Sequence, residues 1–272
     1  MYNQNNEAMV ERKPFILPDA MVGDFTNEEL AEDMDGVRLS FQRVKIPGGG
    51  ALQFEIPSDN PDNPDYAKYL EGVIVYNHPA NAYWPEGSEY DDNTPPLCQS
   101  VDGKLGHGDP GGLCADCGFN RFGSSGRGKS CKNMRHLYLL RSGDYMPIVL
   151  SLPPTSLQPY NAFVNQAFLL RRRGVCSAVV RIGLRRENNG QDYSVATFQK
   201  LYDFEGEELA RIRAYADQFR EQARFMLSQR AELNEAEAGT GIEMGAVPKN
   251  LPDNGGHFEI GMLDGDREPL PA

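Results

Sequence analysis

The stretch CADCGFNRFGSSGRGKSC, residues 114–131, decides which fold the chain adopts, because it carries two incompatible signals. Residues 123–130, GSSGRGKS, match the phosphate-binding pattern G-x-x-x-x-G-K-[ST] at every fixed position. The same stretch begins with a C-x-x-C pair and ends with a further cysteine, as metal sites often do. The first signal predicts a nucleotide-binding domain, and the second predicts a small loop module held together by a metal ion.

A phosphate-binding loop of this kind needs a buried strand before it and a helix after it. Residues 111–122, GGLCADCGFNRF, contain no apolar run of strand length. After the loop, residues 136–141, HLYLLR, predict a strand that ends at the turn SGD rather than a long amphipathic helix. The flanks therefore favour another fold, and nucleotide binding through residues 123–130 stays an alternative.

Four of the five cysteines cluster in a region that has few predicted strands or helices. Between Pro79 and Cys131 turn residues dominate, and an irregular stretch of this length needs something to hold it. Four thiolates prefer zinc to calcium or magnesium, and a closed four-thiolate site leaves no position open for a reaction. We therefore predict a structural zinc ion, with His107 as reserve ligand, and we expect no enzymatic activity. The predicted ligands are Cys98, Cys114, Cys117 and Cys131.

Length and composition suit an ordinary globular protein, with 272 residues, of which 40% are hydrophobic and 24% charged. No segment approaches the roughly 20 consecutive apolar residues that a membrane helix needs. The first residues, MYNQNNEAMVERK, lack the pattern of a signal peptide. We therefore expect a cytoplasmic protein without membrane association, in which the thiols stay reduced.

The formal net charge of −12 is unevenly distributed, because residues 98–202 carry 14 basic and only 6 acidic side chains. Cations interleaved with aromatic rings suit single-stranded nucleic acid, whose phosphates attract the cations and whose bases stack on the rings. For any one of these residues, a solvated arginine or a core aromatic ring is an equally good interpretation. The predicted contact residues are Tyr83, Trp84, Phe122, Arg127, Lys129, Lys132, Arg135, Tyr138, Arg141, Arg181 and Arg185.

The hydrophobic pattern predicts a mostly β fold with flanking helices, of the α+β class. We expect an OB-like antiparallel barrel with an inserted zinc-binding loop module. The first two predicted strands form a hairpin around PGGG, and the last two form a hairpin around ENNG. The predicted strands are residues 36–46, 51–56, 71–78, 134–141, 145–152, 175–186 and 191–204. The predicted helices are residues 154–174, with Thr155 or Ser156 as the N-cap, and residues 205–235.

This pattern divides the chain into three parts. Residues 1–35 form a polar N-terminal segment, and residues 36–235 form the OB-like core with the zinc-binding insertion at about 79–135. Residues 236–272 carry 7 acidic and 2 basic side chains and few large apolar ones, so we expect a disordered acidic tail. Such a tail is a candidate for recruiting replication proteins.

Four stretches resemble a group of phage- and mobile-element-encoded proteins associated with single-stranded DNA. They are VIVYNHPANAYWP (73–85), PPLCQSVDGKLG (95–106), CADCGFNRFGSSGRGKSCKNMRHLYLL (114–140) and PIVLSLPPTSLQPYNAF (147–163). The resemblance implies an OB-like core, zinc on the four cysteines and sequence-independent DNA binding in replication or recombination, in a bacterial host if the gene is phage-borne. It assigns no individual DNA contact. RNA as the ligand, and a zinc-ribbon adaptor that binds a protein partner, stay open as alternatives.

Overall fold

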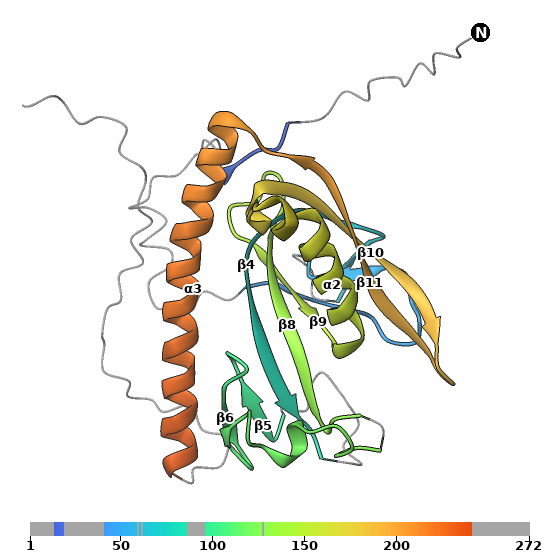
Figure 1. Cartoon of the computed structure of the whole chain (residues 1–272), viewed down its shortest axis with the longest axis vertical. Coiled ribbons are helices and arrows are strands. Elements are labelled where there is room, and N and C mark those ends of the chain that lie inside the picture. Colours follow the sequence, from blue (N-terminus) through green and yellow to red (C-terminus); the bar gives the residue numbers. More distant parts are fainter. Residues whose placement is uncertain are drawn as a thin grey trace, which may run out of the picture.

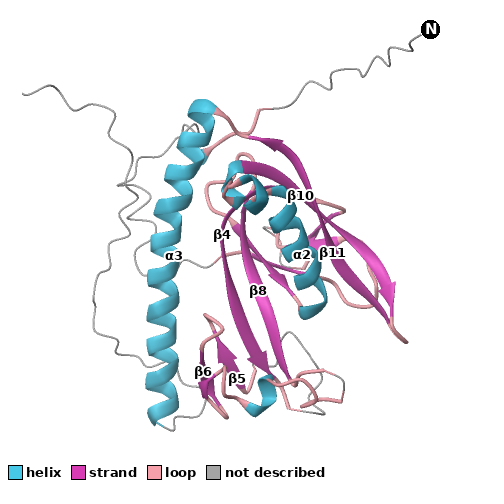
Figure 2. Cartoon of the chain, in the orientation of Figure 1, coloured by secondary structure: helices cyan, strands magenta, loops and turns pink. Residues whose placement is uncertain are grey.

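The structure is a computed structural model that describes residues 14–18, 41–58, 60, 62–85, 96–126 and 128–240, with side chains omitted over 229–240. A curved sheet forms the centre of the molecule. The long helix α3 (Gly206–Thr240) lies along one face of this sheet, and the shorter helix α2 (Pro154–Ala167) packs against the other (Figure 1). Strands make up most of the remaining described chain, as Figure 2 shows.

The main sheet of the described residues has nine strands in the order β1-β9-β8-β4-β5-β6-β7, with the β10–β11 hairpin joined to β4. A separate ladder contains β2 (Phe54–Ile56) and β3 (Asp65–Ala67). Short 3-10 turns are η2 (Gly118–Asn120), η3 (Leu169–Arg171) and η4 (Val175–Ser177). The strands of the main sheet are β1 (Arg43–Lys45), β4 (Leu70–Tyr83), β5 (Cys98–Ser100), β6 (Leu105–Gly108), β7 (Gly112–Leu113), β8 (Cys131–Leu140), β9 (Ile148–Leu152), β10 (Ala178–Asn188) and β11 (Asp192–Asp203).

Strand β4 is the element on which the other strands converge. One edge pairs with β8 along almost its whole length, from Val73 opposite Leu140 to Tyr83 opposite Cys131. The other edge pairs with β10 at residues 70–72 and with β5 at residues 81–83. Between these pairings no described strand borders that edge, and Pro79 lies there. Since proline has no N–H to donate, it is tolerated at such an edge, which lets the strand run past the predicted end at residue 78.

The sheet buries apolar side chains on both faces, because neighbouring residues of a strand point to opposite sides. On one face Ile74 and Leu139 pack under α2 together with Phe168. On the other face Val73 packs under α3 together with Phe219. The two helices therefore cover two separate cores that share the strands β4 and β8.

Helix α2 is shorter than the sequence pattern predicted, and it begins differently. It ends at Ala167 instead of residue 174, and the turn η3 follows. Neither Thr155 nor Ser156 is its N-cap; that position is Pro153. Ser156 is instead buried and accepts a hydrogen bond at its Oγ from the backbone N of Ala196, at 3.0 Å. The hydroxyl thus ties α2 to β11 rather than closing the helix end.

The predicted α+β class, mostly β with flanking helices, is confirmed, whereas the closed antiparallel barrel is not found. The described sheet is open, and it is mixed because β1 runs parallel to β9. The hairpin predicted around PGGG is also wrong, since β1 pairs with β9 and β2 pairs with β3. Val44 of β1 accounts for this change of partner. Pairing at the edge of β9 lets its side chain be fully buried in the core under α2.

The long helix predicted over residues 205–235 is confirmed by α3, and the hairpin around ENNG is confirmed by β10 and β11. Most of the predicted polar segment 1–35, and residues 241–272 of the predicted acidic tail, lie outside the described residues. None of the described helices is both long enough and apolar enough to cross a membrane.

The junction of β4 with β8 and β10 gives a stability prediction. A Cβ atom at Gly72 would lie 2.3 Å from the backbone oxygen of Leu140, a distance that real contacts do not show. We expect Gly72→Ala to lower the free energy of unfolding by about 1–3 kcal/mol, because the sheet must shift to accept the methyl group. Urea denaturation measures this change. The control is Gly48→Ala, which meets nothing within 4 Å; equal stability of both variants would contradict the close approach.

Candidate metal centre and basic surface

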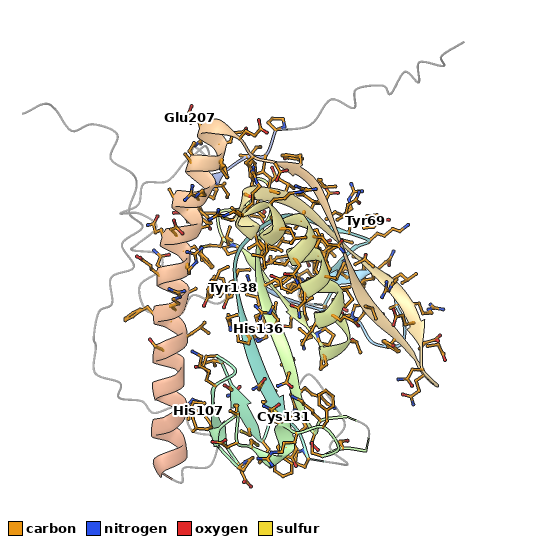
Figure 3. All side chains as sticks on the ribbon, in the orientation of Figure 1. Tyr69, His107, Cys131, His136, Tyr138 and Glu207 are labelled. Atoms are coloured by element: carbon orange, nitrogen blue, oxygen red, sulfur yellow. The ribbon has the colours of Figure 1, made fainter. Side chains whose placement is uncertain are left out.

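The four cysteines predicted as ligands line one small cavity at the far end of the β4–β8 pair. Cys98 begins β5 and Cys131 begins β8, while Cys114 and Cys117 bracket the turn between β7 and η2. Figure 3 labels Cys131 at this end of the molecule. The cavity measures about 10 Å³, which is close to the space of a single water-sized sphere. We call residues 96–131 the cysteine module.

Gly106 on β6 leaves the room that the sulfur atoms occupy. A Cβ atom at this position would lie 3.0 Å from Sγ of Cys98 and 3.7 Å from Sγ of Cys114. Any larger residue would therefore press on the thiol of Cys98 and contact that of Cys114. A glycine inside a strand often marks such a close approach, so the cavity depends on this residue as well as on the cysteines.

The thiols influence one another electrostatically. Burial raises the pKa of Cys131 to about 11, and the neighbouring Cys114, Cys117 and Cys98 add to this rise. Burial also raises the pKa of Cys98, with further contributions from Cys114 and Cys117. Charge on Cys114 and Cys117 therefore disfavours ionisation of Cys98 and Cys131, and a cation placed among them would offset that repulsion.

The donor set suits a soft divalent ion, because all four cysteines carry free thiols. As the side chains stand, however, no group of three or more His, Cys, Asp or Glu residues in the described part of the chain could hold a metal ion. His107, the predicted reserve ligand, is buried but does not line the cavity, and Figure 3 shows it beside α3.

A network of side-chain amides fastens the cysteine module to the β4–β8 pair. The Asn133 amide donates to Oδ1 of Asn81 at 2.7 Å and to Oδ1 of Asn120 at 2.9 Å. Asn120 in turn donates to the backbone oxygen of Cys114 at 2.7 Å. The Lys129 ammonium donates to Oδ1 of Asn120 at 3.1 Å and to Oδ1 of Asn133 at 2.9 Å. Side-chain hydrogen bonds therefore help to join the two parts.

The loop at residues 123–130 lacks the setting of a nucleotide-binding loop. The turn η2 precedes it, and strand β8 rather than a helix follows it. Its polar groups bond within the loop: the Ser130 hydroxyl donates to the Ser124 oxygen at 2.7 Å, and the backbone N of Gly128 donates to the Ser125 oxygen at 2.8 Å. Arg127, a predicted nucleic-acid contact, lies outside the described residues.

Two of the predicted contact residues are open to solvent on the cysteine module. Phe122 is 82% exposed, and the Lys129 ammonium lies 5.2 Å from the centroid of its ring. Lys132 is exposed at the start of β8, and Arg121 is exposed beside Phe122. An open aromatic ring among cations is the arrangement that single-stranded nucleic acid uses.

Other predicted contact residues of this region are already engaged within the protein. Tyr83 stacks on Phe119 with ring centroids 4.4 Å apart, and it also lines the cysteine cavity. Arg135 donates to Oδ1 of Asn77 and lies over the ring of Tyr160 on α2. The half-buried Trp84 directly follows Tyr83. Tyr83 and Arg135 are therefore held by contacts within the protein.

Tyr138 is a correction to the predicted interface. Its side chain is only 5% exposed, because it packs against Phe41 and against Phe219 of α3. A base could not stack on this ring without displacing the helix. The sequence placed Tyr138 in a predicted strand, but it did not indicate that α3 covers this side chain.

The remaining predicted arginines are paired with carboxylates. Arg141 bonds to Asp144 at 2.5 Å. Arg181 bonds to Glu71 and Arg185 bonds to Glu187, each at 2.6 Å. These surface pairs reduce the positive charge that the three arginines can offer to phosphates.

Near Arg181 the structure shows an aromatic residue that the sequence analysis missed. Tyr69 is 48% exposed, and the Arg181 guanidinium lies 5.2 Å and the Lys68 ammonium 5.6 Å from its ring centroid. Its ring lies against Gly183, where a Cβ would meet it at 3.0 Å. The glycine within β10 was the available signal. Figure 3 shows Tyr69 and Cys131 far apart, so the two groups form no single surface.

A second missed feature is a buried cluster of histidine and tyrosine on the α3 side of β4 and β8. His78 is 6% exposed, and its ring centroid lies 5.3 Å from that of His136. The Nε2 atom of His78 lies 3.3 Å from the Tyr138 hydroxyl, and Nδ1 of His136 lies 3.0 Å from the Ser151 hydroxyl. Burial lowers the pKa of His78, although backbone hydrogen bonds partly oppose this effect. The register of β4 with β8 brings these residues together, which the sequence could not show.

Comparison of the chain with protein-family models, with curated proteins and with solved structures finds no match. The arrangement of side chains must therefore carry the functional argument. It offers a soft-metal donor set, a polar attachment of the module that contains it, and an exposed ring with cations beside it.

The buried histidine gives a prediction about pH. Because the pKa of His78 is lowered in the folded protein, protonation favours the unfolded chain, whose histidines titrate near pH 6.5. We expect the contribution of His78 to be complete above about pH 6.5 and to be lost as the pH falls from there through the folded pKa. Urea denaturation of the wild type and of His78→Gln between pH 8 and pH 5 tests this. An equally steep loss of stability in both proteins would contradict it.

Proposed function

We propose that the protein is a non-enzymatic single-stranded DNA-binding protein of phage or mobile-element replication or recombination, stabilised by structural zinc. The observation that carries the proposal is the open Phe122 ring, 82% exposed, with the exposed Arg121 beside it and the exposed Lys132 directly after the module. Stacking on a ring is tolerant of sequence, because every base has a π-face, and nearby cations attract the phosphates. The ligand is therefore a flexible single strand rather than a particular sequence.

In this proposal zinc supplies a crosslink and no chemistry. The ion would be held by Cys98, Cys114, Cys117 and Cys131, which come from the starts of two strands and from the turn between β7 and η2. Joining these segments would fix the loop that carries Phe122. Four thiolate ligands leave no open position on the ion, which supports binding rather than catalysis.

Binding of this kind does not need a closed OB barrel. We propose that the curved strands around β4 and β8 are an open, OB-like variant of such a sheet, with the module at one end as the binding element. The alternative nucleotide-binding function has little support, because a strand follows residues 123–130 and Lys129 is bonded to amides.

A protein-binding adaptor is the second candidate, and one observation favours it. Leu113 is 61% exposed and pairs across β6–β7 with Leu105, which is 36% exposed. Two neighbouring leucines in solvent suit an apolar partner. Absence of salt-dependent binding to any oligonucleotide would favour this adaptor over the DNA-binding function.

The zinc part of the proposal is tested by metal content. We expect purified protein to contain about one zinc ion per chain, and Cys117→Ser to lose it, because a three-thiolate site binds more weakly. The cysteine module should then exchange its amide hydrogens faster, while β10 and β11 stay protected. Cys176→Ser is the matched control, since this buried thiol does not line the cavity. Wild-type protein without zinc, or zinc retained by Cys117→Ser, would overturn this part.

The nucleic-acid part is tested by fluorescence titration with oligo-dT at two salt concentrations. We expect Phe122→Ala to weaken binding by about 1–3 kcal/mol through lost stacking. Lys132→Ala should weaken binding and reduce the salt slope by about one, because one phosphate contact is lost. Arg213→Ala, which removes an exposed cation from α3, is the control for net charge.

Two outcomes would contradict the binding proposal. One is an affinity of wild-type protein for oligo-dT that does not depend on salt, and the other is an unchanged affinity in both Phe122→Ala and Lys132→Ala. The same titration with oligo-rU separates DNA from RNA as the preferred ligand.

A further inference from the structure

We infer that Lys129 is a positioning residue of the zinc site, which holds the amide network against Cys114 and places a positive charge beside the thiolates. The inference rests on the proposed function in one respect, which is that the four cysteines bind zinc. It assigns Lys129 a role that differs from the phosphate contact predicted from the sequence.

The Lys129 ammonium already donates hydrogen bonds within the protein. It is half-buried, and two side-chain oxygens accept from it, Oδ1 of Asn133 at 2.9 Å and Oδ1 of Asn120 at 3.1 Å. The Phe122 ring lies 5.2 Å away. An ammonium group has three donors, so two of them are held by amide oxygens, one in the module and one on β8. A lysine that binds phosphate would extend into solvent instead, as the exposed Lys132 does.

The hydrogen-bond partners of Lys129 connect it to the lining of the cysteine cavity. Asn120 lines this cavity and donates its amide to the backbone oxygen of Cys114 at 2.7 Å. Asn133 joins Asn120 to Asn81, which also lines the cavity. Lys129 therefore fixes the orientation of two amides, one of which holds the backbone of a predicted ligand. Groups that orient ligands in this way affect metal affinity although they do not touch the ion.

The positive charge of Lys129 also matters for a zinc site of four thiolates. Four thiolates on a divalent ion leave a net negative charge, which is costly in a partly buried site unless a cation lies near it. The residues that line the cavity include no Lys, Arg or His. Lys129 supplies a cation one hydrogen bond behind this lining, through Asn120. The arrangement thus joins the orienting role and the compensating charge in one side chain.

Three substitutions at one position separate these contributions. Lys129→Arg keeps the charge and the donors, Lys129→Gln keeps donors without charge, and Lys129→Met keeps length but loses both. Lys132→Met is the matched control. Lys132 is exposed and lies three residues after Lys129, so this variant removes an equal charge without touching the amide network. Each protein is loaded with zinc, and its affinity for the ion is measured by competition with a chelator of known affinity. Oligo-dT binding is measured on the same zinc-loaded samples.

We expect Lys129→Met and Lys129→Gln to bind zinc about 10–100-fold more weakly than the wild type, which is the usual effect of losing such a supporting group. Lys129→Arg should retain most of the affinity, which also shows that a changed residue at this position still folds. Lys132→Met should hold zinc as the wild type does, but should lose about one unit of the salt slope in oligo-dT binding.

The outcomes that overturn the inference differ from those that overturn the proposed function. Wild-type affinity for zinc in both Lys129→Met and Lys129→Gln would refute the role of Lys129 while leaving the zinc site intact. Wild-type affinity for zinc in Lys129→Gln, with a loss in Lys129→Met, would refute the role of the charge and support the role of the orienting contacts. Wild-type protein that takes up no zinc would refute the proposed metal site and this inference together.

Discussion

The backbone pairing of β4 with β8 is the interaction on which the rest of the structure depends. Its ladder runs from Val73 opposite Leu140 to Tyr83 opposite Cys131, so one pair of strands spans both the cores and the cysteine module. At one end its two faces bury the apolar sides of α2 and α3. At the other end it places Cys131 and Tyr83 against the cavity. Because the same strands serve both ends, the position of the module relative to the core is set by main-chain hydrogen bonds.

The two ends of this ladder are stabilised by different physics. The core under α2 and α3 consists of closely packed aliphatic and aromatic side chains, such as Leu137 and Phe168, and needs no ligand. The module contains glycines, turns and amides, with few large side chains fully buried. A segment of this kind gains little free energy from apolar burial. Side-chain amide hydrogen bonds, such as those of Asn133, and the thiol cluster must therefore hold it. This contrast supports the proposal that a metal ion completes the module.

Local signals in the sequence predicted local structure well. Turn chemistry at ENNG led to the β10–β11 hairpin, and a charged amphipathic run led to α3. The spacing of the cysteines led to four residues that the structure places around one cavity. Non-local contacts escaped prediction: β1 joins β9 in parallel across about a hundred residues of chain, and His78 meets His136 only through strand register. Whether the ring of Tyr138 is buried or exposed depends on how α3 packs against the sheet, and no short sequence pattern predicts that packing.

Along the edge of β4 that faces away from β8, residues 73–80 border no described strand, and this has a consequence for association between molecules. An unpaired strand edge is a template on which a second chain can add its own strand. Here Pro79 removes one donor from that edge, and an irregularity between Ile74 and Tyr76 breaks the regular spacing of the others. The loop at residues 101–104 packs over Pro79, since a Cβ on Gly103 would lie 3.1 Å from its ring, and Asn81 donates to the Gly103 oxygen. The module therefore also shields the sheet, and a molecule whose module had loosened would be prone to polymerise edge to edge.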